Sequence, residues 1–157
     1  MNQMNPQMSA DRGPRLSAET LHASTVALDG RAVLLTGPSG SGKSDLALRL
    51  LDRGFVLVSD DQTIVRKDAD RLVASAPPNI AGKLEIRGIG IVEMERADNM
   101  PIALIVELTS NQIQRLPDDS RERPVLGVKL PLVTIDALTA SAPSKVALAL
   151  DRMGLKF

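Results

Sequence analysis

The sequence contains no cysteine, no tryptophan and no tyrosine, and its 157 residues include one histidine and two phenylalanines. Without cysteine the chain cannot form disulfides, thiolate nucleophiles, zinc fingers or iron–sulfur clusters. With a single histidine it cannot build a metal site from several histidines. Because disulfides belong to oxidising compartments, their exclusion favours a reducing, cytoplasmic location.

Net charge and long apolar runs are lacking as well. The 19 basic residues balance 19 acidic ones. A neutral chain with almost no aromatic side chains has neither the basic surface nor the stacking platforms that nucleic acids and anionic membranes require. No apolar run approaches the roughly 18 residues that span a bilayer, and the N-terminus has no apolar signal core. The sequence therefore predicts no nucleic-acid partner and no membrane association.

What is present is the composition of one globular domain. Apolar residues make up 43% of the chain and charged residues 24%, which is typical of a folded protein of this length. Residues 1–17 are polar and aperiodic and contain proline and glycine, so they predict a flexible N-terminal tail. Residues 18–157 are expected to form a single domain.

The first half of that domain has the pattern of an α/β unit. Residues 22–28 and 31–36 are strand-like and flank Asp29-Gly30, a two-residue hairpin signal. In register, that hairpin places His22 opposite Gly37. Apolar spacing predicts a helix over residues 43–53, stopped by Gly54, and a buried strand over residues 55–59.

The second half is richer in strand signals than a doubly wound nucleotide fold. A terminal helix is expected over residues 143–153, before Gly154. Short strands are expected at residues 64–65, 72–74, 84–86, 91–92, 102–108 and 128–135. Together the two halves predict an α/β domain with a mixed sheet.

One segment matches the phosphate-binding pattern G-x-x-x-x-G-K-[ST], directly after an apolar strand and at the start of a helix. It consists of Gly37, Pro38, Ser39, Gly40, Ser41, Gly42, Lys43 and Ser44. Glycines let backbone N–H groups turn inward on phosphates, and the helix N-terminus adds a partial positive charge. Lys43 is expected to neutralise the β- and γ-phosphates of a nucleotide, and the Ser44 hydroxyl to bind Mg²⁺.

Two neighbouring acids, Asp60 and Asp61, follow the strand predicted at residues 55–59. If this strand runs parallel to the one before the glycine loop, both carboxylates emerge at the edge of the sheet that holds the loop. One acid is then available for Mg²⁺ and the other for accepting a proton from an attacking hydroxyl. A solvated acidic turn is the alternative.

Three further features are candidates for the same site. His22, next to the loop in the hairpin register, can hydrogen-bond a carboxylate. In the segment LEIRGIGI, alternation predicts that Glu85 and Arg87 point the same way, toward metal and phosphate or into an exposed salt bridge. A polar loop with Arg115, Arg121 and Arg123 either closes over a phosphate or is merely solvated.

The order of His22, the phosphate loop, Asp60-Asp61 and LEIRGIGI resembles the catalytic domain of HPr kinase/phosphorylase. The resemblance covers residues 21–138. It implies a P-loop kinase domain related to phosphoenolpyruvate carboxykinase, with a mixed sheet. It further implies ATP and Mg²⁺ as cofactors, an HPr-type phosphocarrier of the phosphotransferase system as the protein phosphorylated on serine, and a homo-oligomer, a hexamer.

The same resemblance assigns roles to individual residues. Lys43 and Ser44 match the phosphate and Mg²⁺ ligands. Asp60 matches the residue that acts as base in the kinase reaction and as acid in the reverse reaction. The other matching positions are Asp61 and Glu85 as acids around the metal, His22 as the histidine that tunes the aspartate, Arg87 as the signature arginine and Arg115 as a phosphate contact.

Two departures from the family pattern shape these expectations. The additional N-terminal domain of full-length members is not found in this chain, so it resembles a form with the catalytic domain only. The family's glycine-arginine-asparagine segment, which is tied to phosphorolysis with inorganic phosphate, is not visible in residues 134–145. Kinase activity is expected, and phosphorolysis stays open.

Other functions also fit the glycine loop taken alone. The motif also occurs in P-loop small-molecule kinases and in transporter-type ATPases, but the LSGGQ-like signature of the latter is absent. A nucleotide- or phosphate-sensing module without turnover is the remaining alternative. The combination of Lys43, Ser44, Asp60 and Asp61 favours an enzyme over such a module.

Overall fold

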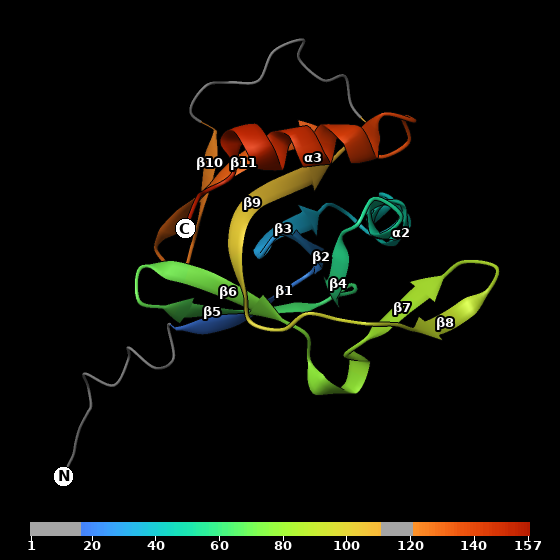
Figure 1. Cartoon of the computed structure of the whole chain (residues 1–157), viewed down its shortest axis with the longest axis horizontal. Helices are drawn as coiled ribbons and strands as arrows, with labels where there is room; N and C mark the ends of the chain where they lie inside the picture. The colour runs from blue at the N-terminus through green and yellow to red at the C-terminus, as the bar shows by residue number, and fades with distance from the viewer. Residues whose placement is uncertain (1–16, 111–120) are drawn as a thin grey trace.

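A curled, nine-stranded mixed sheet with two helices against one face forms the centre of the molecule (Figure 1). The structure is a computed structural model and describes residues 17–110 and 121–157. Most of the predicted N-terminal tail, as well as Arg115, lies outside these residues. The elements are β1 (Ala18–Leu21), β2 (Ala23–Leu28), β3 (Arg31–Thr36), α2 (Lys43–Leu51), β4 (Val56–Ser59), β5 (Thr63–Asp68), β6 (Arg71–Ser75), η1 (Pro78–Ile80), β7 (Lys83–Ile86), β8 (Gly90–Glu93), β9 (Met100–Leu108), β10 (Glu122–Val125), β11 (Val128–Ile135) and α3 (Ala142–Met153).

The pairing of the strands places the ends of several strands at one edge of the sheet. The main order is β1-β5-β6-β9-β3-β2-β4, and β11 joins the other side of β9. Both β3 and β11 run parallel to β9. Because β3 and β4 are each antiparallel to β2, they also run in the same direction. The carboxyl ends of β3, β4, β9 and β11 therefore point toward the same edge.

The predicted hairpin is confirmed in its register. Ala23 pairs with Thr36 and Leu28 with Arg31 across the Asp29-Gly30 turn. His22 lies in a bend just before β2 and not within the strand. The prediction of a strand from residue 22 is therefore off by one residue, and His22 still lies at the end of the hairpin nearest the phosphate loop.

Helix α2 and the strands differ from the predictions mainly at their ends. Leu46, Ala47 and Leu50 form the buried side of α2, as the apolar spacing predicted. The helix ends at Leu51 instead of residue 53 because Gly54, with a φ of 93°, turns the chain into β4. Strands β1 and β10 were missed because their residues are mostly polar and exposed and carry little apolar alternation.

The core lies on both faces of the sheet. On the helical face, α2 and α3 pack on inward-facing residues of β2, β3, β9 and β11. On the other face, residues from β3, β5, β6, β9 and β11 form a second cluster. Strand β9 supplies buried residues to both clusters, so it is the structural centre of the domain.

Truncation of Leu104 in β9 tests this arrangement. The side chain is fully buried in the helix-facing cluster, and Leu104→Ala is expected to lower the free energy of unfolding by about 2 to 5 kcal/mol through lost burial and a cavity. Urea unfolding followed by circular dichroism measures the effect. Leu148→Ala is the matched control because Leu148 is 56% exposed on α3. Equal stability of the two variants would contradict this account of the core.

Candidate functional site

The glycine-rich loop of residues 37–42 connects the end of β3 to the start of α2. Its curvature depends on glycine at two places. At Gly37, a Cβ atom would lie 2.8 Å from Ser41 Oγ and 3.0 Å from the carbonyl oxygen of Leu108. Gly42, the N-cap of α2, has a φ of 99° in the left-handed region, which favours glycine. The loop thus presents the N-terminus of α2 to the pocket described below, the arrangement that suits a phosphate.

The side chain of Lys43 lies inside this loop. It is buried, and its ammonium group donates hydrogen bonds to the carbonyl oxygens of Gly37 at 2.8 Å and Pro38 at 3.1 Å. Ser41 Oγ is the one buried side-chain polar atom in the described part of the chain that has no hydrogen-bond partner. The fixed cation that this loop holds fits an oxygen-rich anion such as a phosphate group.

Asp60, at the end of β4, is buried and held by three donors. Its Oδ1 accepts hydrogen bonds from Ser44 Oγ at 2.6 Å and from Ser24 Oγ at 2.9 Å. Its Oδ2 accepts one from the backbone N–H of Glu85 at 3.2 Å. Asp60 therefore links the first turn of α2, strand β2 and strand β7, and its orientation is fixed on all sides.

Asp61 has a different environment from its neighbour. Its side chain is 64% exposed, and Oδ1 lies 2.9 Å from His22 Nε2, which donates the hydrogen bond. Its backbone N–H donates to Ser24 Oγ at 3.0 Å. The residue has a φ of 70°, a conformation that Asp tolerates better than most side chains. The backbone thus presents the Asp61 carboxylate to solvent beside the imidazole.

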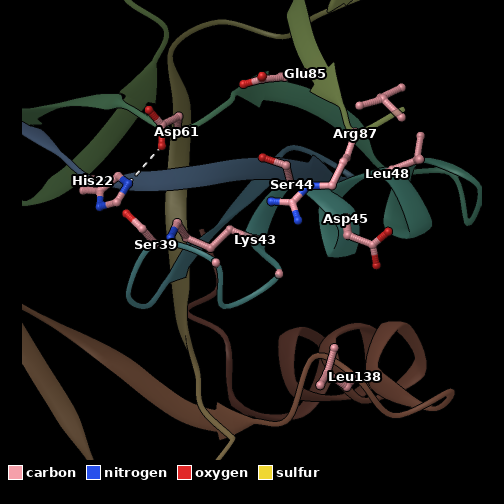
Figure 2. A pocket seen from close by; sticks show the side chains of 13 residues that line it. His22, Ser39, Lys43, Ser44, Asp45, Leu48, Asp61, Glu85, Arg87 and Leu138 are labelled. Carbon is pink, nitrogen blue, oxygen red and sulfur yellow. Dashed lines mark hydrogen bonds and ion pairs between the residues drawn. The ribbon is translucent and has the colours of Figure 1, made fainter. Parts of the chain in front are cut away.

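The hairpin of β7 and β8 brings Glu85 and Arg87 to the same place. The alternation predicted that Glu85 and Arg87 both project from a strand. Strand β7 ends at Ile86, however, so Arg87 belongs to the following turn. Both side chains nevertheless line one pocket with the phosphate loop (Figure 2). The ion pairs of the described residues include none between Glu85 and Arg87.

These groups surround a pocket with a volume of about 480 Å³, a size typical of small-molecule sites. Glu85 and Arg87 lie on one side of the phosphate loop and Leu138 on the other, while His22 and Asp61 lie at one end (Figure 2). The lining consists of His22, Ser39, Gly40, Gly42, Lys43, Ser44, Asp45, Leu48, Asp61, Glu85, Ile86, Arg87 and Leu138.

The residues fit Mg²⁺ bound together with a phosphate-bearing ligand. In the described ranges, no three Asp, Glu or His side chains are close enough to hold a metal by themselves. Mg²⁺ does not require such a cluster, because it usually keeps several waters and binds one or two carboxylates plus substrate phosphates. Ser44, Asp61 and Glu85, which line the pocket, provide the oxygen ligands it prefers, and Asp60 contacts Ser44 Oγ at 2.6 Å.

The arginines predicted around a phosphate divide into two groups. Arg115 lies outside the described residues. Arg123 and Arg121 both contact Glu107 of β9, at 2.7 Å and 3.5 Å, and Arg121 also donates to Thr134 Oγ1 at 2.6 Å. The two described arginines are thus engaged by the protein itself.

Sequence reasoning missed Ser24, although its hydroxyl bonds both to Asp60 and to the backbone of Asp61. A signal existed, because Ser24 is two residues after His22 and alternation places the two side chains on one face. Leu138, which also lines the pocket, had no comparable signal. Its place follows only from the path of the chain after β11.

The chain matches the model of a known family over most of its length. The HPr Serine kinase C-terminal domain family matches residues 15–149. In the parts of the chain that the structure describes, no helix combines the length and apolar character that crossing a bilayer requires.

Relatives with names and a solved structure agree with that match. An HPr kinase/phosphorylase from Chlorobium limicola is 37% identical over 87% of this chain, and one from Burkholderia lata is 39% identical over 74%. The matches span only 44% and 39% of those two relatives. The structure of the Hpr(Ser) kinase/phosphatase from Coxiella burnetii has a TM-score of 0.75 and 26% identity, covering 85% of this chain and 94% of that chain. The predicted α/β fold with a mixed sheet is confirmed.

Proposed function

Because the chain belongs to the HPr Serine kinase C-terminal domain family, we propose that it transfers the γ-phosphoryl group of ATP to a serine of an HPr-type phosphocarrier protein. The observation that carries the proposal is the convergence of Lys43, the Ser44–Asp60 pair and the His22–Asp61 pair at one edge of the sheet. Each of these groups has a separate task in phosphoryl transfer.

The phosphate loop and Lys43 bind and orient the donor nucleotide. Gly42, Lys43 and Ser44 at the start of α2 line the pocket, and the N–H groups of a helix N-terminus suit phosphate oxygens. Two loop carbonyls hold the Lys43 ammonium at the loop. There its positive charge neutralises negative charge on the β- and γ-phosphates. Positioning of this kind supplies most of the catalysis in phosphoryl transfer, because the protein forms no covalent bond to the phosphate.

Ser44 and Glu85, which line the pocket, are the residues that would hold Mg²⁺, which when bound neutralises charge on the phosphates, and Asp60 orients the Ser44 hydroxyl. Asp60 is suited to this side of the site because it is buried and already bonds Ser44. Arg87 adds a cation from the β7–β8 turn, opposite the loop. Its fixed charge stabilises the phosphoryl oxygens as the bond to the leaving ADP breaks.

The geometry favours Asp61 over Asp60 as the proton acceptor, which revises the assignment expected from the resemblance. Both oxygens of Asp60 are engaged by donors inside the protein, whereas Asp61 is exposed and a protein substrate can reach it. As the serine oxygen forms its bond to the γ-phosphorus, the bond to ADP breaks and the hydroxyl proton moves to the Asp61 carboxylate. His22 holds that carboxylate in place.

The role of His22 as a positioning residue is testable. His22→Ala removes the hydrogen bond to Asp61 Oδ1. We expect kcat for carrier phosphorylation to fall about tenfold, which is less than the full contribution of a general base because Asp61 itself remains. The KM for ATP stays unchanged, because the imidazole is separate from the phosphate ligands. His22→Gln, which keeps a donor, is expected to recover part of the loss. Steady-state kinetics measure both, and a raised KM with unchanged kcat would reject the role.

Dependence of ATP consumption on the carrier tests the overall proposal. With Mg·ATP and the phosphocarrier, ADP release is expected to rise with carrier concentration and to saturate, while ADP release without carrier stays at background. A coupled enzymatic assay follows the ADP. If ADP forms at the same rate without the carrier, or only when a small-molecule acceptor is added, a different kinase or ATPase activity replaces this proposal.

The same proposal includes assembly and location. Family resemblance supports a homo-oligomer, a hexamer, and the lack of cysteine in the chain is compatible with a reducing cytoplasm. Mass photometry of the purified protein checks the oligomer and is expected to give six times the chain mass of 16.8 kDa. A single species at the chain mass would reject the hexamer without affecting the assignments of the active-site residues.

A further inference from the structure

Leu138 is one of three apolar side chains, with Leu48 and Ile86, among the residues that line the pocket. It lies in the turn between β11 and α3 and is 81% exposed, the highest value among the large hydrophobic side chains that the described residues leave exposed. Its side chain lines the same pocket as Lys43 and Ser44. An apolar group in that position favours a ligand that covers it.

The turn that carries Leu138 is fixed to helix α2. The guanidinium of Arg49 donates hydrogen bonds to the carbonyl oxygens of Ala137 and Thr139, on both sides of Leu138. Arg49 is in turn paired with Asp45 at 3.1 Å, one turn earlier on the helix. Leu138 is therefore held at a defined position relative to the helix that begins at the phosphate loop.

The turn also abuts the phosphate loop itself. A Cβ atom at Gly42 would lie 3.2 Å from the Cβ of Ala137. Because β3 and β11 both run parallel to β9, the phosphate loop and the turn after β11 emerge at the same edge, where ligands of open α/β sheets bind. Figure 2 shows Leu138 across the loop from Glu85 and Arg87. The part of the pocket near Leu138 is thus separate from the transfer site near His22 and Asp61.

We propose that Leu138 is the contact for the nucleoside base of the donor nucleotide, with Arg49 as the residue that positions it. The inference rests on the proposed function, because it takes the phosphates to lie in the loop of residues 37–42. From that loop the nucleoside extends along the pocket, away from the groups that receive the γ-phosphoryl. The face of a purine is flat and apolar, and the exposed Leu138 side chain offers it a matching surface.

The turn offers the base little beyond this apolar contact. The carbonyls of Ala137 and Thr139 are engaged by Arg49, and the N–H of Leu138 donates to Asp136 Oδ1 at 2.9 Å. With these groups already bonded, the turn contacts the face of the base and does not read its edge. ADP and GDP are therefore expected to bind with Kd values that differ by less than about tenfold, the effect of one hydrogen bond.

Leu138→Trp gives a direct test, because the chain has no tryptophan or tyrosine of its own. The new indole is the single strong fluorophore, and stacking on an aromatic surface strengthens base binding. We expect Mg·ADP to quench its emission and to bind at least fivefold more tightly than to wild type, while inorganic pyrophosphate does neither. Leu148→Trp on α3 is the control, since Leu148 is exposed and does not line the pocket. The tryptophan emission of this variant is expected to stay unchanged when either ligand is added.

Leu138→Ala tests the same contact by removing most of the apolar side chain. By calorimetry its Kd for Mg·ADP is expected to rise roughly fivefold, while its Kd for pyrophosphate stays as in wild type. Unchanged ADP binding in this variant, or Leu138→Trp emission that shifts with protein concentration and not with ADP, would overturn the proposal in favour of a contact with a second chain. If pyrophosphate does not bind the wild type at all, it is the phosphate site of the proposed function that has failed.

Discussion

Asp61→Asn is expected to lower kcat for carrier phosphorylation by about 10²- to 10⁴-fold, the contribution of a general base, while the Kd for Mg·ADP stays within about twofold of wild type. Asparagine has nearly the same shape and keeps an oxygen for the bond from His22, but it cannot take the serine proton. Asp61 is also exposed, so the substitution leaves no buried group unpaired. Single-turnover kinetics with the carrier and calorimetry with Mg·ADP measure the two quantities.

Asp60→Asn is the matched variant, and its expected effect is of another kind. Asp60 accepts from Ser24, Ser44 and the backbone of Glu85, so one of these donors would face the new amide N–H₂ group. The cost of a buried unpaired donor is about 1 to 3 kcal/mol. We therefore expect a lower free energy of unfolding and weaker Mg·ADP binding. The two aspartates would have the reverse roles if Asp60→Asn kept wild-type stability and Mg·ADP affinity but had a strongly reduced kcat, while Asp61→Asn stayed active.

Lys43→Met is expected to weaken Mg·ATP binding roughly 10- to 100-fold, the worth of a hydrogen bond to a charged group. The ammonium is buried and directed by the carbonyls of Gly37 and Pro38, and methionine has a similar length without the charge. Calorimetry with a non-hydrolysable ATP analogue gives the affinity, and thermal unfolding shows whether the fold is kept.

Lys145→Met is the control for that substitution. Lys145 is exposed on α3 and does not line the pocket, so its loss removes one positive charge of the protein without touching the loop. Nucleotide affinity close to wild type is expected. Equal affinities of Lys43→Met and Lys145→Met would mean that the loop does not bind the phosphates through Lys43.

Local patterns were sufficient for the parts of the site that depend on neighbours in sequence. The glycine loop follows a strand and starts a helix, and this context alone predicted a loop that the structure places at the pocket. The Asp29-Gly30 turn fixed the register of β2 and β3, which placed His22 near the loop. The hydrogen bond from His22 to Asp61 confirms that the imidazole pairs with one of the two acids.

The difference between the two aspartates could not be derived from their sequence positions. Asp60 and Asp61 are adjacent, and what separates them is the environment supplied by distant segments. Ser24 of β2, Ser44 of α2 and the backbone of β7 surround Asp60, whereas Asp61 is exposed beside His22. Such long-range pairing has no periodicity to detect.

Side chains in turns were also beyond the reach of sequence patterns. The position of Leu138 depends on how Arg49 of α2 fixes the turn after β11, 88 to 90 residues away along the chain. Arg121 and Arg123 looked like phosphate ligands because they lie in a polar, arginine-rich segment. Their pairing with Glu107 arises from the position of β10 beside β11, and β10 itself has too little apolar character to be predicted.

The intact mass of an HPr-type phosphocarrier, measured after incubation with this protein and Mg·ATP, shows directly whether this protein phosphorylates the carrier. We expect one added phosphate, located on a serine, with wild-type protein, and at most a trace of it with Asp61→Asn in the same time. Inorganic phosphate added afterwards measures phosphorolysis in the same sample. A carrier whose mass does not change with a wild-type protein that binds ATP would contradict the assignment as a carrier kinase.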